Sequence, residues 1–363
     1  MRTMPGRVPS PLVLILLLPV ADAAAAVPGP VELRDQVDAD RLQDDLRALT
    51  GHDPIPDGDD EVLVRTRNVH HPHHRLAGAW IEDRFEAVPG LDVSRETFDA
   101  AGESDLFNVV AELPGAEPDL PILILGAHYD SIASATVGWE PATDAAPGAD
   151  DDASGVAAIL EVARVLAAHP GGTRRTVRFV AFSAEEYGLL GAYEHVARVE
   201  DRGDDVALML SLDPVGYDPG GTSTLWVPYD ARWEEPADRL AEVAAAQGGR
   251  LSITTIDADL IGGDARSDHF PFWDAGIPAL HLASFPQPPT YHTVSDDLDV
   301  VDPTFHGNVT ALVAAFAAAE VELLEPPDDE GDGCGECGAS LASGASSGWL
   351  LAATLAASRR RRR

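Results

Sequence analysis

Apolar runs alternate with helix-like segments along most of the chain. Residues 120–127 (LPILILGA) are an unbroken apolar run, which is typical of a strand buried on both faces of a sheet. Further strand-like runs lie at residues 176–183, 206–213 and 277–282. Helical spacing is found at residues 153–168, 230–246 and 303–324. The alternation predicts βαβ units, and therefore an α/β fold with a largely parallel sheet.

Both ends of the chain depart from this pattern. Residues 1–25 combine two arginines, a short apolar run and several alanines, which is the layout of a secretory signal peptide. The apolar run is shorter than the roughly twenty residues that a membrane-spanning helix needs, so we predict cleavage and export. Residues 326–338 are an acidic, Gly-rich linker that contains both cysteines, and residues 339–363 end in an arginine cluster. Residues 26–325 remain as one folded domain, which must be stable without a disulfide.

The last segment resembles the C-terminal sorting tags described as myxobacterial, in which a cysteine precedes an apolar stretch and terminal arginines. Cys334 and Cys337 precede the apolar run here, and residues 359–363 are all arginine. The resemblance implies transient membrane retention, processing near the cysteines, and attachment to the cell surface or outer membrane. We expect a secreted or surface-attached protein that contacts a membrane only through its two terminal segments.

Charge narrows the range of partners. The chain has 25 Lys+Arg residues, all of them arginine, against 61 Asp+Glu, which gives a formal net charge of −36. Nucleic acid is excluded as a partner, because phosphate binding needs a basic face. The acidity is interpreted as solvation of the surface. The sequence leaves the oligomeric state open.

Chemically active residues follow the predicted strands. His128 comes directly after the 120–127 run, and Asp130 could accept its second ring N–H. Residues 150–152 are three consecutive aspartates at the start of a predicted helix. One acidic residue is enough to cap a helix, whereas three repel one another unless a cation offsets them. This run therefore indicates a metal site.

Three further motifs extend the set. Glu185 and Glu186 follow the 176–183 strand, where one carboxylate could bind a metal while its neighbour faces a water. Asp213 closes a buried strand, and His292 lies in the loop after residues 277–282. Such positions meet at the carboxyl edge of an open α/β sheet. Two imidazoles and three carboxylates, without a thiolate, are suited to a pair of zinc ions.

In this order the motifs resemble those of the dizinc exopeptidases of the bacterial leucyl aminopeptidase and aminopeptidase Y type. They read HYDS, GADDDASG, SAEEYGLLGA, LD, SDHFPFWDAGIPAL and YHT. The resemblance covers roughly residues 60–322. It implies a three-layer α/β/α fold whose central sheet is mixed and mostly parallel.

Carried over position by position, the resemblance also implies roles. The five metal ligands would be Asp151 bridging both zinc ions, Glu186 and His292 completing one, and His128 and Asp213 completing the other. Glu185 would be the general base and later the proton donor to the leaving amine. Tyr291 would donate to the oxyanion, and Asp130 would support the ligand set without touching a metal.

The activity implied is that of an exported zinc aminopeptidase acting on peptides. The same family includes carboxypeptidases and glutaminyl cyclases, and residues 279–282 (ALHL) are similar to the cyclases. The run of three aspartates favours two metals over the single zinc of a cyclase. An inactive surface binding domain is the remaining alternative.

Several conspicuous residues are assigned no part in the chemistry. The histidines at positions 70, 71, 73 and 74 precede an amphipathic pattern that starts near Leu76, and we expect them at the surface by chance. His269 is expected to serve packing and hydrogen bonding. The tryptophans, Trp226 among them, are expected in the core or at its rim.

Overall fold

The computed structural model describes residues 30–326, which belong to one compact unit. The predictions for residues 1–25 and 339–363, and for all but the first residue of the 326–338 linker, lie outside the described residues. Within residues 30–326, no helix combines the length and the apolar character needed to cross a membrane.

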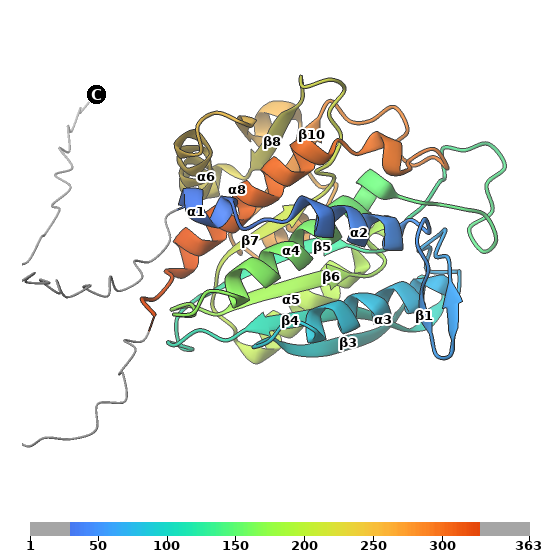
Figure 1. The fold of residues 1–363 in the computed structure, drawn as a ribbon, viewed down its shortest axis with the longest axis horizontal. Helices are drawn as coiled ribbons and strands as arrows, with labels where there is room; N and C mark the ends of the chain where they lie inside the picture. Colours follow the sequence, from blue (N-terminus) through green and yellow to red (C-terminus); the bar gives the residue numbers. More distant parts are fainter. Residues whose placement is uncertain (1–29, 327–363) are drawn as a thin grey trace, which may run out of the picture. The chain divides into compact units, whose positions relative to one another are not determined.

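An eight-stranded sheet runs through the middle of the molecule, in the order β3-β4-β6-β5-β7-β10-β8-β9 (Figure 1). Its strands are β3 (Asp92–Ala100), β4 (Glu103–Leu113), β5 (Ile122–His128), β6 (Val177–Phe182), β7 (Val206–Leu212), β8 (Thr224–Tyr229), β9 (Ser252–Asp257) and β10 (Ala279–Phe285). The central strands β6, β5, β7 and β10 pair in parallel, as do β8 and β9. The remaining pairs are antiparallel. The predicted mixed sheet is confirmed.

Helices cover both faces of this sheet. One face packs against α1 (Pro30–Arg34), α2 (Ala39–Leu49), α3 (His73–Glu86), α4 (Gly155–Ala167), α6 (Glu234–Ala246) and α8 (Pro303–Val321). The other face packs against α5 (Leu190–Arg202) and α7 (His269–Asp274). A small hairpin of β1 (Ile55–Asp57) and β2 (Asp60–Val62) is separate from the sheet. The three-layer α/β/α architecture is therefore confirmed.

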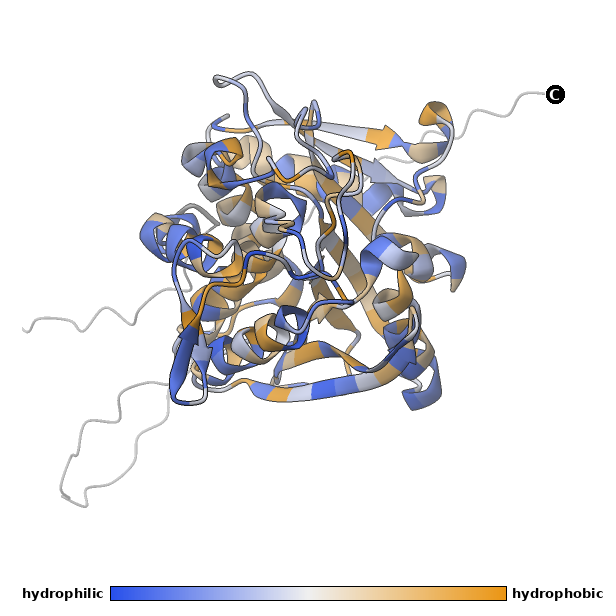
Figure 2. Cartoon of the chain, turned by 90° about the vertical axis from the view of Figure 1, so that its right-hand side faces the viewer, coloured by the Kyte–Doolittle hydropathy of each residue, from blue (hydrophilic) through white to orange (hydrophobic). Residues whose placement is uncertain are grey.

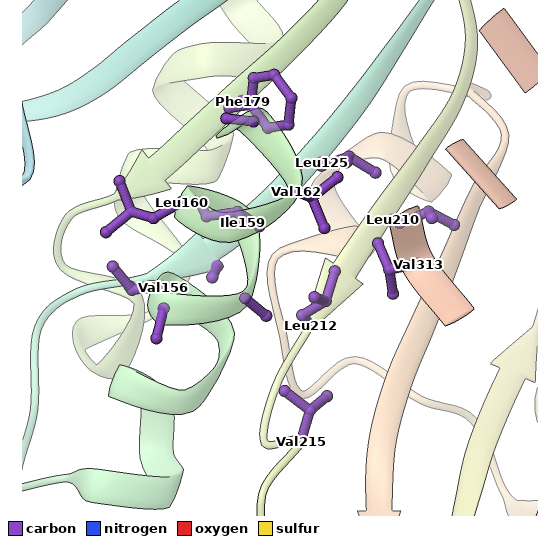
Figure 3. Packing of buried hydrophobic residues seen from close by; sticks show 14 of the residues in the cluster. Leu125, Val156, Ile159, Leu160, Val162, Phe179, Leu210, Leu212, Val215 and Val313 are labelled. Carbon is purple, nitrogen blue, oxygen red and sulfur yellow. The ribbon is translucent and has the colours of Figure 1, made fainter. Parts of the chain in front are cut away.

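Helix α4 anchors the middle of the core. Its residues are buried except for Arg164 and Ala167, and Figure 3 shows its side chains beside those of β5 and β7. Leu160 of α4, Leu125 of β5 and Leu212 of β7 are completely buried. Burying a leucine side chain stabilises the fold by about 1.5–3 kcal/mol. The carboxyl ends of β5 and β7 are thus held on a rigid platform.

The start of α4 lies against the end of β7. A Cβ added at Gly155 would sit 2.2 Å from the backbone oxygen of Leu212, so only glycine fits there. This close approach brings the residues that precede α4 next to Asp213, which follows Leu212. The packing of one helix start therefore helps to assemble the polar edge of the sheet.

The central elements were predicted from the sequence, but the margins of the sheet were not. Strands β3, β4, β8 and β9 were not predicted, and helix α6 begins at Glu234, after a 3-10 turn at Ala231–Trp233, instead of at residue 230. Strand β3, at the bottom of Figures 1 and 2, alternates between hydrophilic and hydrophobic residues. Strands β3 and β9 are largely solvated, so they lack the continuous apolar run that identifies a central strand.

Candidate active site

The predicted site residues gather at the carboxyl edge of the central strands. His128 is the last residue of β5, Asp213 directly follows β7, and Glu185 begins a 3-10 turn shortly after β6. Asp151 lies in the segment before α4, and His292 lies in the loop after β10. Parallel strands place their carboxyl ends together, and open α/β sheets bind ligands at this edge.

A first group of ligand atoms surrounds the ring of His128. Its Nε2 atom lies 3.1 Å from Asp151 Oδ1 and 3.5 Å from Asp213 Oδ1. All three ligand atoms lie within 4.8 Å of one another, and the three residues are buried. This spacing could hold one metal ion.

A second group surrounds the ring of His292. Its Nε2 atom lies 3.0 Å from Asp151 Oδ2 and 3.1 Å from Glu186 Oε2. These three residues also place one ligand atom each within 4.8 Å of the others. Asp151 turns a different oxygen to each group, so it is shared by both. The structure brings all five predicted ligands together in two sets that meet at this carboxylate.

The neighbours of Asp151 hold it in place. The backbone N–H groups of Asp150 and Asp151 each donate to the carboxylate of Asp296, at 3.0 Å. Asp152 accepts from the backbone N–H of His128, and Asp150 from that of Gly216. Of the three consecutive aspartates, only the middle one faces both imidazoles. Asp296 was missed in the sequence; its one signal was an acidic residue four positions after His292.

Asp130 orients the two glutamates. Its carboxylate accepts the backbone N–H of Glu185 at 2.9 Å and that of Glu186 at 3.2 Å. The sequence suggested instead that this carboxylate accepts the second ring N–H of His128. Nδ1 of His128 lies closer to the backbone oxygen of Asp130, at 3.1 Å, than to its carboxylate, at 3.6 Å. The carboxylate is already occupied by the two backbone donors, so Asp130 fixes the imidazole through its main chain.

Glu185 lies at the border of the first ligand group. Its Oε2 atom is 3.9 Å from His128 Nε2, and it offers an oxygen within 4.8 Å of ligand atoms of both His128 and Glu186. Burial raises the pKa of Glu185 well above its usual value. Its carboxylate is thus within reach of anything held between the ligands.

The electrostatics of the site favour added positive charge. Burial and the neighbouring Asp151 raise the pKa of Glu186 to about 8. Burial opposes a charged ring at His292, but Asp151 and Glu186 outweigh it and raise its pKa to about 10. The site thus holds more carboxylates than its own cationic groups can neutralise, so an added cation would be stabilised there.

The residues present also fit two metal ions sterically and chemically. Glu186 Oε1 is buried and has no hydrogen-bond partner among the described residues, and His292 Nε2 approaches both of its carboxylates without forming a hydrogen bond. Unpaired buried ligand atoms are costly, and a bound cation would satisfy them. Imidazole and carboxylate ligands without thiolate are a zinc-compatible set.

A separate buried cluster lies behind Asp213. His281 places Nδ1 2.7 Å from Asp264 Oδ2 and Nε2 2.6 Å from the backbone oxygen of Asp213. Both neighbours are acceptors; burial opposes a charged ring, but Asp264 outweighs it and raises the pKa of His281. His269, stacked on this ring, places Nε2 3.0 Å from the backbone oxygen of Asp264, in agreement with the packing role expected for it. Asp264, His269 and His281 are close enough together to bind a metal, but His281 has no free nitrogen.

A cavity of about 100 Å³ adjoins Asp213 and Tyr291. It is lined by Asp213, Pro214, Trp226, Arg266, His281, Ala283, Ser284, Phe285, Gln287 and Tyr291. Trp226 and Phe285 stack with ring centres 4.0 Å apart, and Tyr291 stacks on His292 at 3.8 Å. Tyr291 is thus beside the second ligand group, and the cavity walls include Trp226, which the sequence had assigned to the core or its rim.

One of the four clustered histidines was misjudged. His74 is completely buried, with Nδ1 2.8 Å from the backbone oxygen of Arg67 and Nε2 2.8 Å from Ser183 Oγ. Helix α3 begins at His73, earlier than expected, so the next residue turns toward the sheet. The expectation of an incidental surface position is wrong for His74.

Arg67 was also missed. It is completely buried and donates to the backbone oxygens of Tyr129, Pro147 and Gly148, which flank the site segments. A lone arginine in a loop gives no sequence signal for such a role.

Known proteins with similar sequences and folds identify the family of this chain. The chain is similar to leucine aminopeptidase 1 of Trichophyton equinum, with 28% identity over 78% of this chain and 76% of that one. Among solved structures it is similar to LapA aminopeptidase of Legionella pneumophila, with a TM-score of 0.66, 23% identity, and 82% and 75% of the two chains covered. A zinc aminopeptidase from Bacillus subtilis has a TM-score of 0.51, 28% identity, and 61% and 52% covered.

Coverage of the relatives varies. Several of them are matched over only 29–64% of their own length. The model of peptidase family M28 matches residues 108–317, which is more than half of this chain and spans every residue of the two ligand groups. The chain therefore belongs to peptidase family M28.

Proposed function

We propose that the chain is a zinc-dependent aminopeptidase that removes N-terminal residues from peptides. The observation that carries the proposal is the pair of ligand groups sharing Asp151, with the carboxylate of Glu185 beside them. The names of the relatives, leucine aminopeptidase and zinc aminopeptidase, support the same activity.

Within this proposal the five ligands are His128, Asp151, Glu186, Asp213 and His292, and they hold two zinc ions per chain. Zinc held there would supply Lewis acidity, which polarises a scissile carbonyl and makes water acidic enough to lose a proton near neutral pH. Asp130, Asp152 and Asp296 keep the ligand-bearing backbone in position through the hydrogen bonds described above.

Glu185 carries the proton. Its carboxylate accepts a proton from the attacking water and returns it to the nitrogen of the departing amine, which balances the hydrolysis. The backbone hydrogen bond to Asp130 fixes the start of the turn that aims this side chain. Tyr291 is held beside the second ligand group by stacking on His292, and its hydroxyl can donate to the oxygen that becomes negative.

Three substrates separate the proposal from its alternatives. The zinc-loaded protein should hydrolyse leucyl-p-nitroanilide, whereas a carboxypeptidase would prefer an N-acylated peptide and a cyclase would convert an N-terminal Gln peptide. Metal analysis of the same sample should give about two zinc per chain. Two zinc without hydrolysis of any peptide would contradict the aminopeptidase and favour a binding domain.

We also propose, from residues 1–25 alone, that the protein is exported. Sequencing the N-terminus of the mature protein tests this proposal. Cleavage near Ala23 or Ala25 is expected, and an intact Met1 on the extracellular protein would contradict it.

A further inference from the structure

The cavity beside Asp213 has one positively charged arginine in its wall. Arg266 lines it together with the stacked rings of Trp226 and Phe285. Asp213 is the one acidic residue of the lining, and it belongs to the first ligand group. A metal ion bound to Asp213 would offset that negative charge, which leaves the wall with a positive character.

The neighbouring carboxylate engages only one nitrogen of Arg266. Its Nε donates to Asp264 Oδ1 at 2.8 Å, while the other oxygen of Asp264 lies 2.7 Å from Nδ1 of His281. Asp264 is thus shared between Arg266 and His281. Neither terminal nitrogen of Arg266 has a hydrogen-bond partner in residues 30–326, and its side chain is 53% exposed.

Aromatic rings complete the same wall. The stacked rings of Trp226 and Phe285 supply an apolar surface against which methylene groups can pack.

We propose that this cavity receives the side chain of the substrate's N-terminal residue, and that Arg266 selects an acidic side chain, glutamate above its isostere glutamine. The inference rests on the proposed aminopeptidase function and deepens it. A glutamate side chain has the methylenes to cover the aromatic wall and the carboxylate to meet the guanidinium. Charge-assisted hydrogen bonds of this kind are stronger than neutral ones, although the partial exposure of Arg266 weakens them.

The test compares the glutamyl, glutaminyl and leucyl p-nitroanilides with the full-length, zinc-loaded protein. Wild type should have a kcat/KM for the glutamyl substrate about tenfold above that for the glutaminyl one, which corresponds to about 1.4 kcal/mol. Arg266→Gln should bring this ratio close to one by lowering glutamyl turnover. Raising the ionic strength should lower the wild-type ratio, because the interaction is partly exposed.

The chain offers a matched control. Arg232 also donates Nε to an aspartate, Asp230 Oδ1, at 2.8 Å, although its Nη2 adds bonds to Asp230 Oδ2 and the backbone oxygen of Trp273. Its side chain is 52% exposed, and it is not among the residues that line the cavity. Arg232→Gln removes the same charge and should leave the glutamyl-to-glutaminyl ratio unchanged. Arg266→Lys, which keeps the charge, should retain part of the preference and guards against a folding defect in Arg266→Gln.

The outcomes are distinct. A wild-type ratio at or below one, or a ratio that Arg266→Gln does not change, would overturn the acidic preference while leaving the aminopeptidase intact. An equal loss of preference in Arg232→Gln would overturn the assignment to Arg266. Zinc-loaded protein that hydrolyses none of the three substrates would overturn the proposed function itself.

Discussion

At the scale of single residues, the site assigns different work to two adjacent glutamates. Glu186 faces His292 at 3.1 Å, whereas Glu185 lies at the border of the other group, 3.9 Å from His128. Their backbone N–H groups share one acceptor, Asp130, which fixes both at once. Two adjacent side chains of the same type can therefore have different roles.

Substitutions of the two glutamates should therefore have different effects on zinc content and activity. Glu185→Gln should lower kcat by about 10²–10⁴-fold, because the proton acceptor is lost, and should keep about two zinc per chain. Glu186→Ala should lose zinc as well as activity. Metal analysis and steady-state kinetics on both variants check this, and loss of zinc from Glu185→Gln would refute the assignment of the base.

A buried histidine outside the two ligand groups should make stability depend on pH. Burial lowers the pKa of His306 to about 4, while its Nε2 donates to the backbone oxygen of Ser154. In the unfolded chain its pKa is about 6.5, so the unfolded state binds the proton first as the pH falls. The stabilising contribution is complete above about pH 6.5 and is lost as the pH drops to about 4.

His306→Gln, which keeps a side-chain N–H donor but cannot titrate, isolates this effect. The gap between the two pKa values is worth about 3 kcal/mol. In metal-free protein, the difference in unfolding free energy between wild type and variant should therefore shrink by up to about 3 kcal/mol between pH 7 and pH 4. Denaturant titrations at several pH values measure it. Parallel curves would contradict the burial argument.

The residues of the site could be predicted to different degrees. Four of the five ligands follow a buried strand, and Asp151 lies in an acidic run before a helix, so local pattern and family resemblance were enough to find them. Asp296 and Arg67 act through backbone groups of distant segments, and His74 contacts the distant hydroxyl of Ser183. Such contacts depend on how the chain folds back on itself, which no local pattern records.

At the scale of elements, the start of α4 and the end of β7 form one unit. The Cβ clash that excludes any side chain at Gly155 is with the residue before Asp213. Gly155→Ala should therefore push the two elements apart, lower stability by about 1–3 kcal/mol and weaken zinc retention.

Gly307 in α8 is the matched control, because a Cβ there would meet no atom within 4 Å. Gly307→Ala should be neutral or stabilising by up to about 1 kcal/mol, since alanine favours a helix. Thermal unfolding of both variants compares the two helices. Equal effects would show that the close approach at Gly155 is unimportant.

The elements at the centre of the sheet were predictable and those at its margin were not. Strands β5 and β6 are buried along their whole length, so their composition is almost purely apolar. Strand β9 is exposed or half-exposed throughout, and its sequence SITTID resembles a polar loop. Its strand character comes from pairing with β8, a tertiary effect that sequence periodicity does not contain.

At the scale of the whole molecule, the fold concentrates negative charge around one buried point. The chain has a formal net charge of −36, and Asp150, Asp151 and Asp152 are buried together. Burial of carboxylates is costly unless cations accompany them. Bound metal should accordingly stabilise the folded state relative to the unfolded chain.

Removal of the metal should lower the melting temperature. A ligand held at 1,000 times its dissociation constant stabilises the folded state by about 4 kcal/mol. Scanning calorimetry before and after a chelator should reveal a clear drop in Tm that added zinc reverses. High salt should restore part of the loss, because it screens the repulsion. An unchanged Tm after complete zinc removal would contradict this dependence.

Anomalous diffraction at the zinc edge, from crystals of the zinc-loaded protein, tests the central claim most directly. The account predicts two strong peaks, one among His128, Asp151 and Asp213, and one among Asp151, Glu186 and His292. A single peak, or a peak at the cluster of Asp264, His269 and His281 in place of these, would contradict it.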